Sequence, residues 1–310
     1  MQMSESGSAP SSESVIAEPP RHPRRLVFLG TPDDAVPTLL ALHEAGFEIP
    51  LVVSQPDRRR GRGKQLVPSP VKAAASGLGI AVSSELADVL GVEADLAVVV
   101  AYGEIIPTSM LEELPMVNLH FSLLPRWRGA APVERAILAG DEQTGVCVMQ
   151  LAPKLDTGAV YRRSVVAIDD RITAAELRSK LADLGARAMT KALSDGLDTP
   201  IPQDGEVVYA AKFEPHDFEI DFSNTADQVM RLIRIGGAFT TFRGERFKIW
   251  EAEAIESDLI GQPGTVAETT TVTGEGALEL VMVQPAGKPR MAASAWANGA
   301  HLQPNDRFGP

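Results

Sequence analysis

The chain has 310 residues, of which 44% are hydrophobic and 23% charged, a balance typical of a water-soluble protein of about two domains. Its net charge of −12 argues against a general nucleic-acid-binding surface but leaves room for a local basic patch. The single cysteine, Cys147, stands in an apolar run. We therefore expect a buried thiol in a reducing compartment, and neither a disulfide nor a catalytic nucleophile.

Residues 1–23 hold six Ser, four Pro and three Glu and lack the apolar segment of a signal peptide. We expect them to form a disordered tail. No run approaches the roughly 18 apolar residues that a membrane-spanning helix needs. These features predict a cytoplasmic protein without a membrane partner, and we expect a monomer.

From residue 24 onward, short apolar strands alternate with helices. We expect strands at residues 25–31, 49–55, 80–83, 95–102, 117–124, 146–152 and 160–168, and helices at residues 35–45, 71–78, 132–139 and 173–193. This alternation predicts an α/β domain with a doubly wound, mostly parallel Rossmann-like sheet over residues 24–198. Ligands of such sheets bind beyond the carboxyl ends of the strands.

The pattern changes beyond residue 198. We interpret residues 199–217 as a linker. It begins with two closely spaced prolines, Pro200 and Pro202, and an acidic stretch follows them. A helix at residues 225–235 is followed by short β-rich pieces separated by turn signals, and residues 291–299 have the pattern of a closing helix. Residues 218–310 are therefore predicted to form a smaller C-terminal β-barrel, OB-like domain.

The most informative segment is residues 117–129. If it is a strand that ends in a loop, Asn118 and His120 stand two residues apart and share one face of an interior strand. Asp156 follows the neighbouring strand, and its carboxylate can reach a histidine at the same sheet edge. Taken alone, a hydrogen-bonded core Asn and His, and an Asp in a turn, remain open readings.

At these residues the chain resembles the folate-dependent formyltransferases. The resemblance is carried by Asn118-Leu119-His120, Ser122-Leu123-Leu124-Pro125, Arg128-Gly129-Ala130-Ala131-Pro132 and Leu155-Asp156-Thr157-Gly158. The run from Leu123 to Pro132 is similar to the branch of that family that acts on methionyl-tRNA. Further matches in the same order extend the resemblance over roughly residues 25–310.

The resemblance implies a catalytic group and a folate site. Asn118 and His120 would stabilise the oxyanion, and Asp156 would hold the His120 tautomer, favour its imidazolium form and assist proton transfer. The folate site would involve Ser122, Leu123, Leu124, Pro125, Val100 and Tyr102. The implied co-substrate is 10-formyltetrahydrofolate, and the implied acceptor is the α-amino group of initiator methionyl-tRNA.

A basic, Gly- and Pro-rich segment at residues 57–72 holds six basic residues against one acidic residue. Such a loop attracts phosphates, although a solvated loop is the other reading. With the family resemblance, the predicted tRNA-binding residues are Arg58, Arg59, Arg60, Arg62 and Lys64. Arg62 is the residue that we expect to read the tRNA.

Other chemistries find little support in the sequence. Neither a Walker loop nor a Gly-x-Gly-x-x-Gly motif follows the first strand, and cysteine and histidine are too scarce for a metal site, so we expect no metal. Within the enzyme class, a formyltransferase acting on a nucleotide amino sugar or on glycinamide ribonucleotide remains an alternative. A non-catalytic tRNA-binding protein is a minor one.

Overall fold

The structure, a computed structural model, describes residues 16–59 and 66–309. The chain forms two compact units. The first unit comprises Met1–His120, Cys147–Arg163 and Gly185–Gln203, and the second comprises Phe121–Val146, Ser164–Leu184 and Asp204–Pro310. No helix among the described residues is long and apolar enough to cross a membrane.

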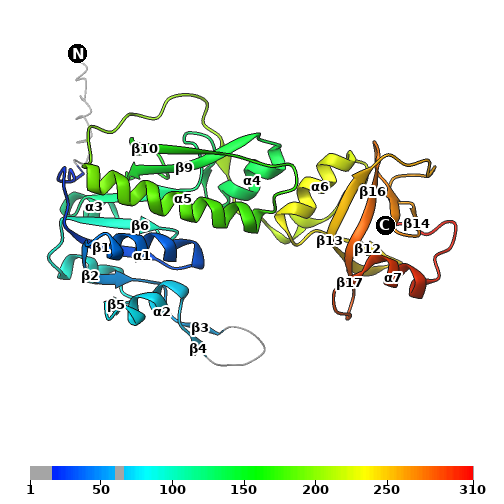
Figure 1. Ribbon diagram of the computed structural model, residues 1–310, viewed down its shortest axis with the longest axis horizontal. Coiled ribbons are helices and arrows are strands. Elements are labelled where there is room, and N and C mark those ends of the chain that lie inside the picture. Colours follow the sequence, from blue (N-terminus) through cyan, green and yellow to red (C-terminus); the bar gives the residue numbers. More distant parts are fainter. Residues whose placement is uncertain (1–15, 60–65, 310) are drawn as a thin grey trace, which may run out of the picture. The chain divides into compact units, whose positions relative to one another are not determined.

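The main sheet has seven strands. Its order is β10 (Val160–Ala167), β9 (Gln143–Gln150), β7 (Met116–His120), β6 (Leu96–Val100), β1 (Arg25–Gly30), β2 (Glu48–Val53) and β5 (Ala81–Ser83). All of them except β7 carry a label in Figure 1. The pairs β7–β6, β6–β1, β1–β2 and β2–β5 are parallel, whereas β7 and β9 run antiparallel. The predicted mostly parallel, Rossmann-like sheet is confirmed.

The helices of this sheet begin and end at signals that the sequence contains. They are α1 (Val36–Glu44), α2 (Pro70–Gly77), α3 (Thr108–Glu113), α4 (Pro132–Ala139) and α5 (Ala174–Asp195), with short 3₁₀ helices at Asp33–Ala35 and Leu86–Gly91. The Ser69 side chain caps α2 by accepting from the Lys72 N–H. Gly140 ends α4 in the left-handed conformation, at φ 73°. The sequence analysis did not predict α3 or the helix at Leu86–Gly91.

Both faces of the sheet in the first unit are buried. On one face, alternate strand residues such as Val27, Leu29 and Val99 pack against α3 and the 3₁₀ helix at Leu86–Gly91. On the strand that carries the candidate site, Leu119 packs against Gly185 of α5, where an added Cβ would lie 2.5 Å from a Leu119 methyl group. Gly185 thus lets α5 lie close to β7.

The C-terminal part of the second unit is an antiparallel six-stranded sheet, which confirms the predicted small β domain. The strand order is β12 (Phe239–Phe242), β13 (Glu245–Ile255), β16 (Ala277–Pro285), β15 (Thr270–Val272) and β14 (Val266–Ala267), with β17 (Met291–Ala292) paired to β16. Arg243 and Gly244 both have positive φ, 50° and 81°, which suits the two-residue hairpin between β12 and β13.

Two helices and an aromatic cluster complete this sheet. Helix α6 (Ala226–Ile235) begins with a capping box in which Thr225 and Gln228 exchange side-chain and backbone hydrogen bonds. Helix α7 (Ala293–Ala300) follows β17, so the segment expected as one helix starts with two strand residues. Phe247, Trp296 and Phe308 pack with ring centroids 4.7–5.7 Å apart.

The structure differs from the expected tail and linker. Within the tail, Ala17 donates its N–H to the Leu111 carbonyl at 2.7 Å, and Arg21 accepts from the Leu197 N–H at 2.7 Å, so residues 16–23 are held on the first unit. Residues 1–15 lie outside the described residues. Within the linker, β11 (Tyr209–Ala210) pairs with β8 (Arg128–Gly129), and the 3₁₀ helix Pro215–Phe218 follows.

Candidate active site

Strand β7 carries the first two predicted catalytic residues. Asn118 lies opposite Val99 of β6 and Met149 of β9, and His120 lies opposite Cys147, so β7 is an interior strand. Because side chains alternate along a strand, Asn118 and His120 share the face opposite Leu119. Asn118 is half-buried, and His120 is 6% exposed. The expected core thiol of Cys147 is buried.

Asp156 meets His120 as the sequence predicted. Its Oδ2 lies 3.7 Å from His120 Nδ1, and the two side chains are only 13% and 7% exposed. At this separation, an ion pair between the carboxylate and a protonated ring gains more energy than the same pair would gain in water. The structure thus brings two of the three predicted catalytic residues together, with Asn118 two residues away on the same strand face.

The loop that presents Asp156 has a constrained backbone. Asp156 adopts the left-handed conformation, at φ 49°, which Asp tolerates better than most residues. Gly158 lies against the preceding strand, and a Cβ on it would come 1.7 Å from the Gln150 carbonyl oxygen. Only glycine fits there without moving the chain, which gives the Asp-Thr-Gly spacing a physical reason.

Tyr102 and Val100, predicted for the folate site, stand at the carboxyl end of β6, and both are buried. The Tyr102 hydroxyl donates to Glu104 Oε2 at 3.3 Å. Burial, followed by the charge of Glu104, raises the pKa of Tyr102 to about 12, so the phenol keeps its proton at neutral pH. The Thr31 hydroxyl donates to the Tyr102 carbonyl at 2.9 Å.

A hollow of about 240 Å³ opens beside Tyr102 at the carboxyl ends of β1, β2 and β6. It is lined by Thr31, Pro32, Gln55, Pro56, Arg58, Val67, Ser69, Ala101, Tyr102 and Gly103. This is the edge at which sheets of this type bind their ligands.

The remaining predicted folate residues, Ser122, Leu123, Leu124 and Pro125, form the turn after β7 in the second unit. The Ser122 hydroxyl is buried and donates to the Arg126 carbonyl at 2.6 Å. Leu124 is also buried, and its bond to Pro125 is cis.

Asp141, which the sequence analysis missed, holds the segment that follows this turn. Its carboxylate accepts from Arg126 at 2.6 and 2.9 Å and from the Trp127 indole N–H at 2.7 Å. The hydrogen bond to Asp141 raises the pKa of Arg126. The Asp follows a helix C-terminus and matches no motif, so no local pattern indicated its role.

The basic segment is only partly described. Arg58 and Arg59 are exposed on β3 (Arg58–Arg59), which pairs with β4 (Leu66–Val67). Lys72 binds Asp57 at 2.7 Å, which offsets part of the positive charge. The other predicted tRNA-binding residues, Arg60, Arg62 and Lys64, lie outside the described residues.

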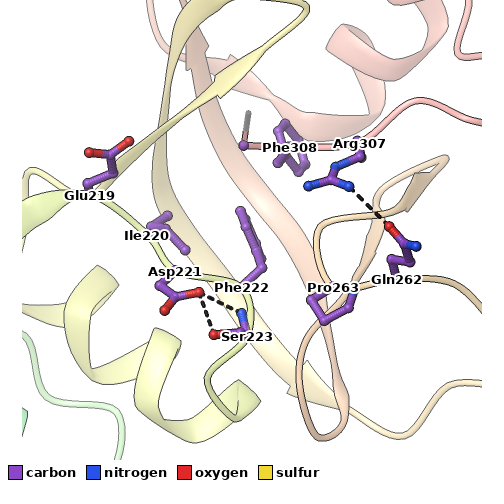
Figure 2. Close-up of a pocket in the computed structure, with 10 residues that line it drawn as sticks. Glu219, Ile220, Asp221, Phe222, Ser223, Gln262, Pro263, Arg307 and Phe308 are labelled. Atoms are coloured by element: carbon purple, nitrogen blue, oxygen red, sulfur yellow. Dashed lines mark hydrogen bonds between the residues drawn. The ribbon is translucent and has the colours of Figure 1, made fainter.

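A larger hollow, of about 600 Å³, lies in the second unit (Figure 2). It is lined by Glu219, Ile220, Asp221, Phe222, Ser223, Gln262, Pro263, Arg307, Phe308 and Gly309. Asp221 accepts from the backbone and hydroxyl of Ser223, and Arg307 donates to Gln262. None of the predicted site residues that the structure describes lines this hollow. Among the described residues, no group of three or more His, Cys, Asp or Glu could hold a metal ion.

The geometry defines a class of protein: a Rossmann-like enzyme with an amide, an imidazole and a carboxylate on an interior strand and its neighbouring loop. The comparisons give the particular family. The family model described as formyl transferase matches residues 24–193, and that of the formyl transferase C-terminal domain matches residues 212–301. The chain belongs to the formyl transferase family.

A curated relative agrees with this assignment, and solved structures share the fold. The chain is 45% identical over 303 residues to a methionyl-tRNA formyltransferase of Roseobacter denitrificans, covering 92% of this chain and 98% of the relative. Its fold is similar to that of a sugar 3N-formyltransferase, WlaRD, with a TM-score of 0.64 and 16% identity over 86% of this chain and 98% of that one. The fold is also similar to that of HypX from Aquifex aeolicus in complex with tetrahydrofolic acid, with a TM-score of 0.63 and 19% identity. That match covers 91% of this chain and 48% of HypX.

Proposed function

We propose that this chain transfers the formyl group of 10-formyltetrahydrofolate to the α-amino group of methionine on initiator methionyl-tRNA. The observation that carries the proposal is the contact between His120 and Asp156 beside Asn118, at one edge of the sheet. The acceptor follows from the relatives that share over 40% identity along nearly the full chain and act on methionyl-tRNA by name.

The catalytic group suits attack by an amine on a formyl carbon. Negative charge develops on the formyl oxygen, and the Asn118 amide and a His120 N–H are the donors that stabilise it. Asp156 Oδ2 lies 3.7 Å from His120 Nδ1 and orients the imidazole ring.

The amine must lose a proton as the new bond to carbon forms. An α-amino group has a pKa of about 7.7–8.0, so part of it is already neutral at cellular pH. Asp156 positions a water that passes the proton of the attacking nitrogen to the leaving folate nitrogen. No covalent enzyme intermediate is needed, and the Ser122 hydroxyl is already engaged with the Arg126 carbonyl.

The residues present fit a folate as the formyl donor. Val100 and Tyr102 lie buried at the carboxyl end of β6, and the Tyr102 phenol keeps its proton at neutral pH. These residues and the hollow beside Tyr102 suit a folate, which would supply the activated formyl group.

We further propose that two basic regions bind the tRNA. The first is the segment with Arg58, Arg59, Arg60, Arg62 and Lys64. The second lies on one face of β13 and its neighbours in the domain at residues 218–310, and we call it the basic-aromatic stripe. It comprises Phe239, Arg246, Lys248, Trp250 and Arg290.

The contacts within the basic-aromatic stripe support this role. The Arg290 guanidinium lies 3.2 Å from the centroid of the Trp250 ring, and that of Arg246 lies 3.7 Å from the centroid of Phe239. Cations held over aromatic faces are typical of surfaces that track a nucleic-acid backbone and stack on its bases. Replacing Arg290 with Ala is expected to weaken binding of tRNA in a filter assay while the Km for folate stays unchanged.

The substrate is tested by incubating the protein with 10-formyltetrahydrofolate and charged initiator tRNA. Elongator methionyl-tRNA, a nucleotide amino sugar and glycinamide ribonucleotide serve as competing acceptors. We expect formylmethionyl-tRNA from the initiator alone. Formylation of a sugar or of glycinamide ribonucleotide, or tRNA binding without any product, would contradict the proposal. We also propose that the protein acts as a monomer in the cytoplasm.

A further inference from the structure

Gln203 makes two contacts that no catalytic motif in the sequence predicts. Its side-chain Nε2 donates to the Asp156 carbonyl and to the Gly158 carbonyl, each at 2.8 Å. One carboxamide nitrogen carries two hydrogens, so a single side chain satisfies two backbone acceptors of the loop that presents Asp156. The side chain is half-buried, and it stands 47 and 45 residues from these partners.

The backbone explains how Gln203 reaches this loop. Val160, the first residue of β10, forms an antiparallel bridge with Ile201, with reciprocal N–H to carbonyl bonds of 2.8 and 2.9 Å. Continued by two residues, the antiparallel register brings Gln203 opposite Gly158. The segment after α5 is thus tied to the same loop by its backbone and by its side chain.

The Asp156 turn needs such an anchor. The left-handed backbone of a non-glycine residue is unfavourable, so the surroundings of Asp156 must impose it. Half-buried carbonyls without partners would add a further cost. Gln203 holds the carbonyl of Asp156 itself and that of Gly158, so it fixes the backbone on both sides of Thr157.

We propose that Gln203 is a positioning residue for formyl transfer, because its carboxamide fixes the turn that directs the Asp156 carboxylate at His120. This inference rests on the proposed function of Asp156. It assigns Gln203 no contact with the substrate, so its loss should lower kcat without raising either Km.

The test is a double-mutant cycle of Gln203→Met and Asp156→Asn, with kcat and Km measured for both substrates. Met keeps the length of Gln but has no N–H donors. We expect Gln203→Met to lower kcat about 10- to 100-fold, as misplacement of a catalytic group does, with each Km within about twofold. In the Asp156→Asn background, the same change should lower kcat less than about threefold, because residues that act as a unit are not additive.

A matched control and a second variant complete the design. Gln303 also donates through Nε2 to a backbone carbonyl, that of His301 at 2.9 Å, and Gln303→Met should leave kcat unchanged. If Gln203→Met does not fold, Gln203→Asn enters the same cycle, since it keeps the amide but is one methylene shorter.

Three results would overturn the inference. If Asp156→Asn has a reduced kcat but the Gln203 variant has the wild-type kcat, the role of Gln203 is refuted and that of Asp156 is not. Effects that multiply in the double mutant show that the Gln203 variant merely reduces the folded fraction. A normal rate for Asp156→Asn contradicts the proposed function of Asp156, and with it this inference.

Discussion

At the scale of single residues, the candidate site depends on a few side chains and on one position, Gly158, that has no side chain. His120 Nδ1 and Asp156 Oδ2 lie 3.7 Å apart, and both side chains are nearly buried. Strand β7 carries His120, and the loop after the neighbouring strand β9 carries Asp156. Gly158 is as necessary as either of them, since the Gln150 carbonyl occupies the space that any Cβ would take.

Replacing Gly158 with Ala should therefore damage the site. The added methyl group meets the Gln150 carbonyl oxygen at 1.7 Å, so the loop must shift and Asp156 moves with it. We expect at least about a tenfold loss of kcat, since displacements near 1 Å can cost a hundredfold, together with a lower Tm. Gly299→Ala in α7 is the control, because nothing lies within 4 Å of its Cβ; helix propensity predicts an unchanged or raised Tm there. The same kcat and the same Tm for Gly158→Ala and Gly299→Ala would refute the steric argument.

The sequence alone could bring the proposed catalytic residues Asn118 and His120 together for a local reason. Asn118 and His120 stand two residues apart on one strand, so period-two alternation alone places them on one face. Gln203 and Asp141 gave no such signal, because their partners lie in other elements and their roles depend on register and loop paths.

At the scale of elements, most of the expected helices and strands formed within one to three residues of their predicted ends. Helix α4 has the predicted bounds, because Pro132 opens it and Gly140 closes it. Strand β7 ends at His120, whereas the sequence predicted a strand to residue 124. Turns take over there, since Ser122 folds back on the Arg126 carbonyl. Apolar composition alone cannot distinguish a buried strand from a buried turn.

The C-terminal segment is held on the β domain by an ion pair whose strength should depend on pH. Arg243 donates to Asp306 at 3.0 and 2.6 Å, and these hydrogen bonds hold the pKa of the Asp306 carboxyl below its usual value. A lowered folded pKa means that the stabilisation is complete above the ordinary carboxyl pKa and is lost as the pH falls through the folded value.

Asp306→Asn should therefore lower the Tm at pH 7 by a few degrees, because it removes the charge that Arg243 binds. The difference from the wild type should shrink as the pH falls below about 4. Thermal melts at pH 7, 5 and 3.5 measure this, with the exposed Asp258→Asn as control. A difference that stays constant down to the lowest pH would contradict the ion-pair account.

At the scale of the whole molecule, composition and family resemblance predicted the order of the two domains better than the behaviour of the residues that precede the first one. The Rossmann-like sheet and the antiparallel domain are both present. Residues 16–23 differ from the expected tail, because their composition is that of a flexible segment while their contacts are specific. Ile16 packs on the core of the first unit, and Pro23 is buried. Composition does not report a few well-placed contacts.

Two truncations test the role of this segment. Removing residues 1–15 should leave the Tm and kcat unchanged. Removing residues 1–23 also deletes Ile16 and the hydrogen bonds made by Ala17 and Arg21, so we expect the Tm to fall by several degrees. Equal melting temperatures for the two truncated proteins would show that residues 16–23 contribute no stability.

The most direct measurement is the single-turnover rate of formyl transfer to initiator methionyl-tRNA by His120→Ala, with both substrates saturating. Loss of one oxyanion donor predicts a rate at least about 100-fold below that of the wild type. The tRNA affinity should stay within about twofold, and the exposed His43→Ala should leave the rate unchanged. A His120→Ala protein that formylates its tRNA within a few-fold of the wild-type rate would contradict the proposal that His120, held by Asp156, stabilises the reacting oxygen.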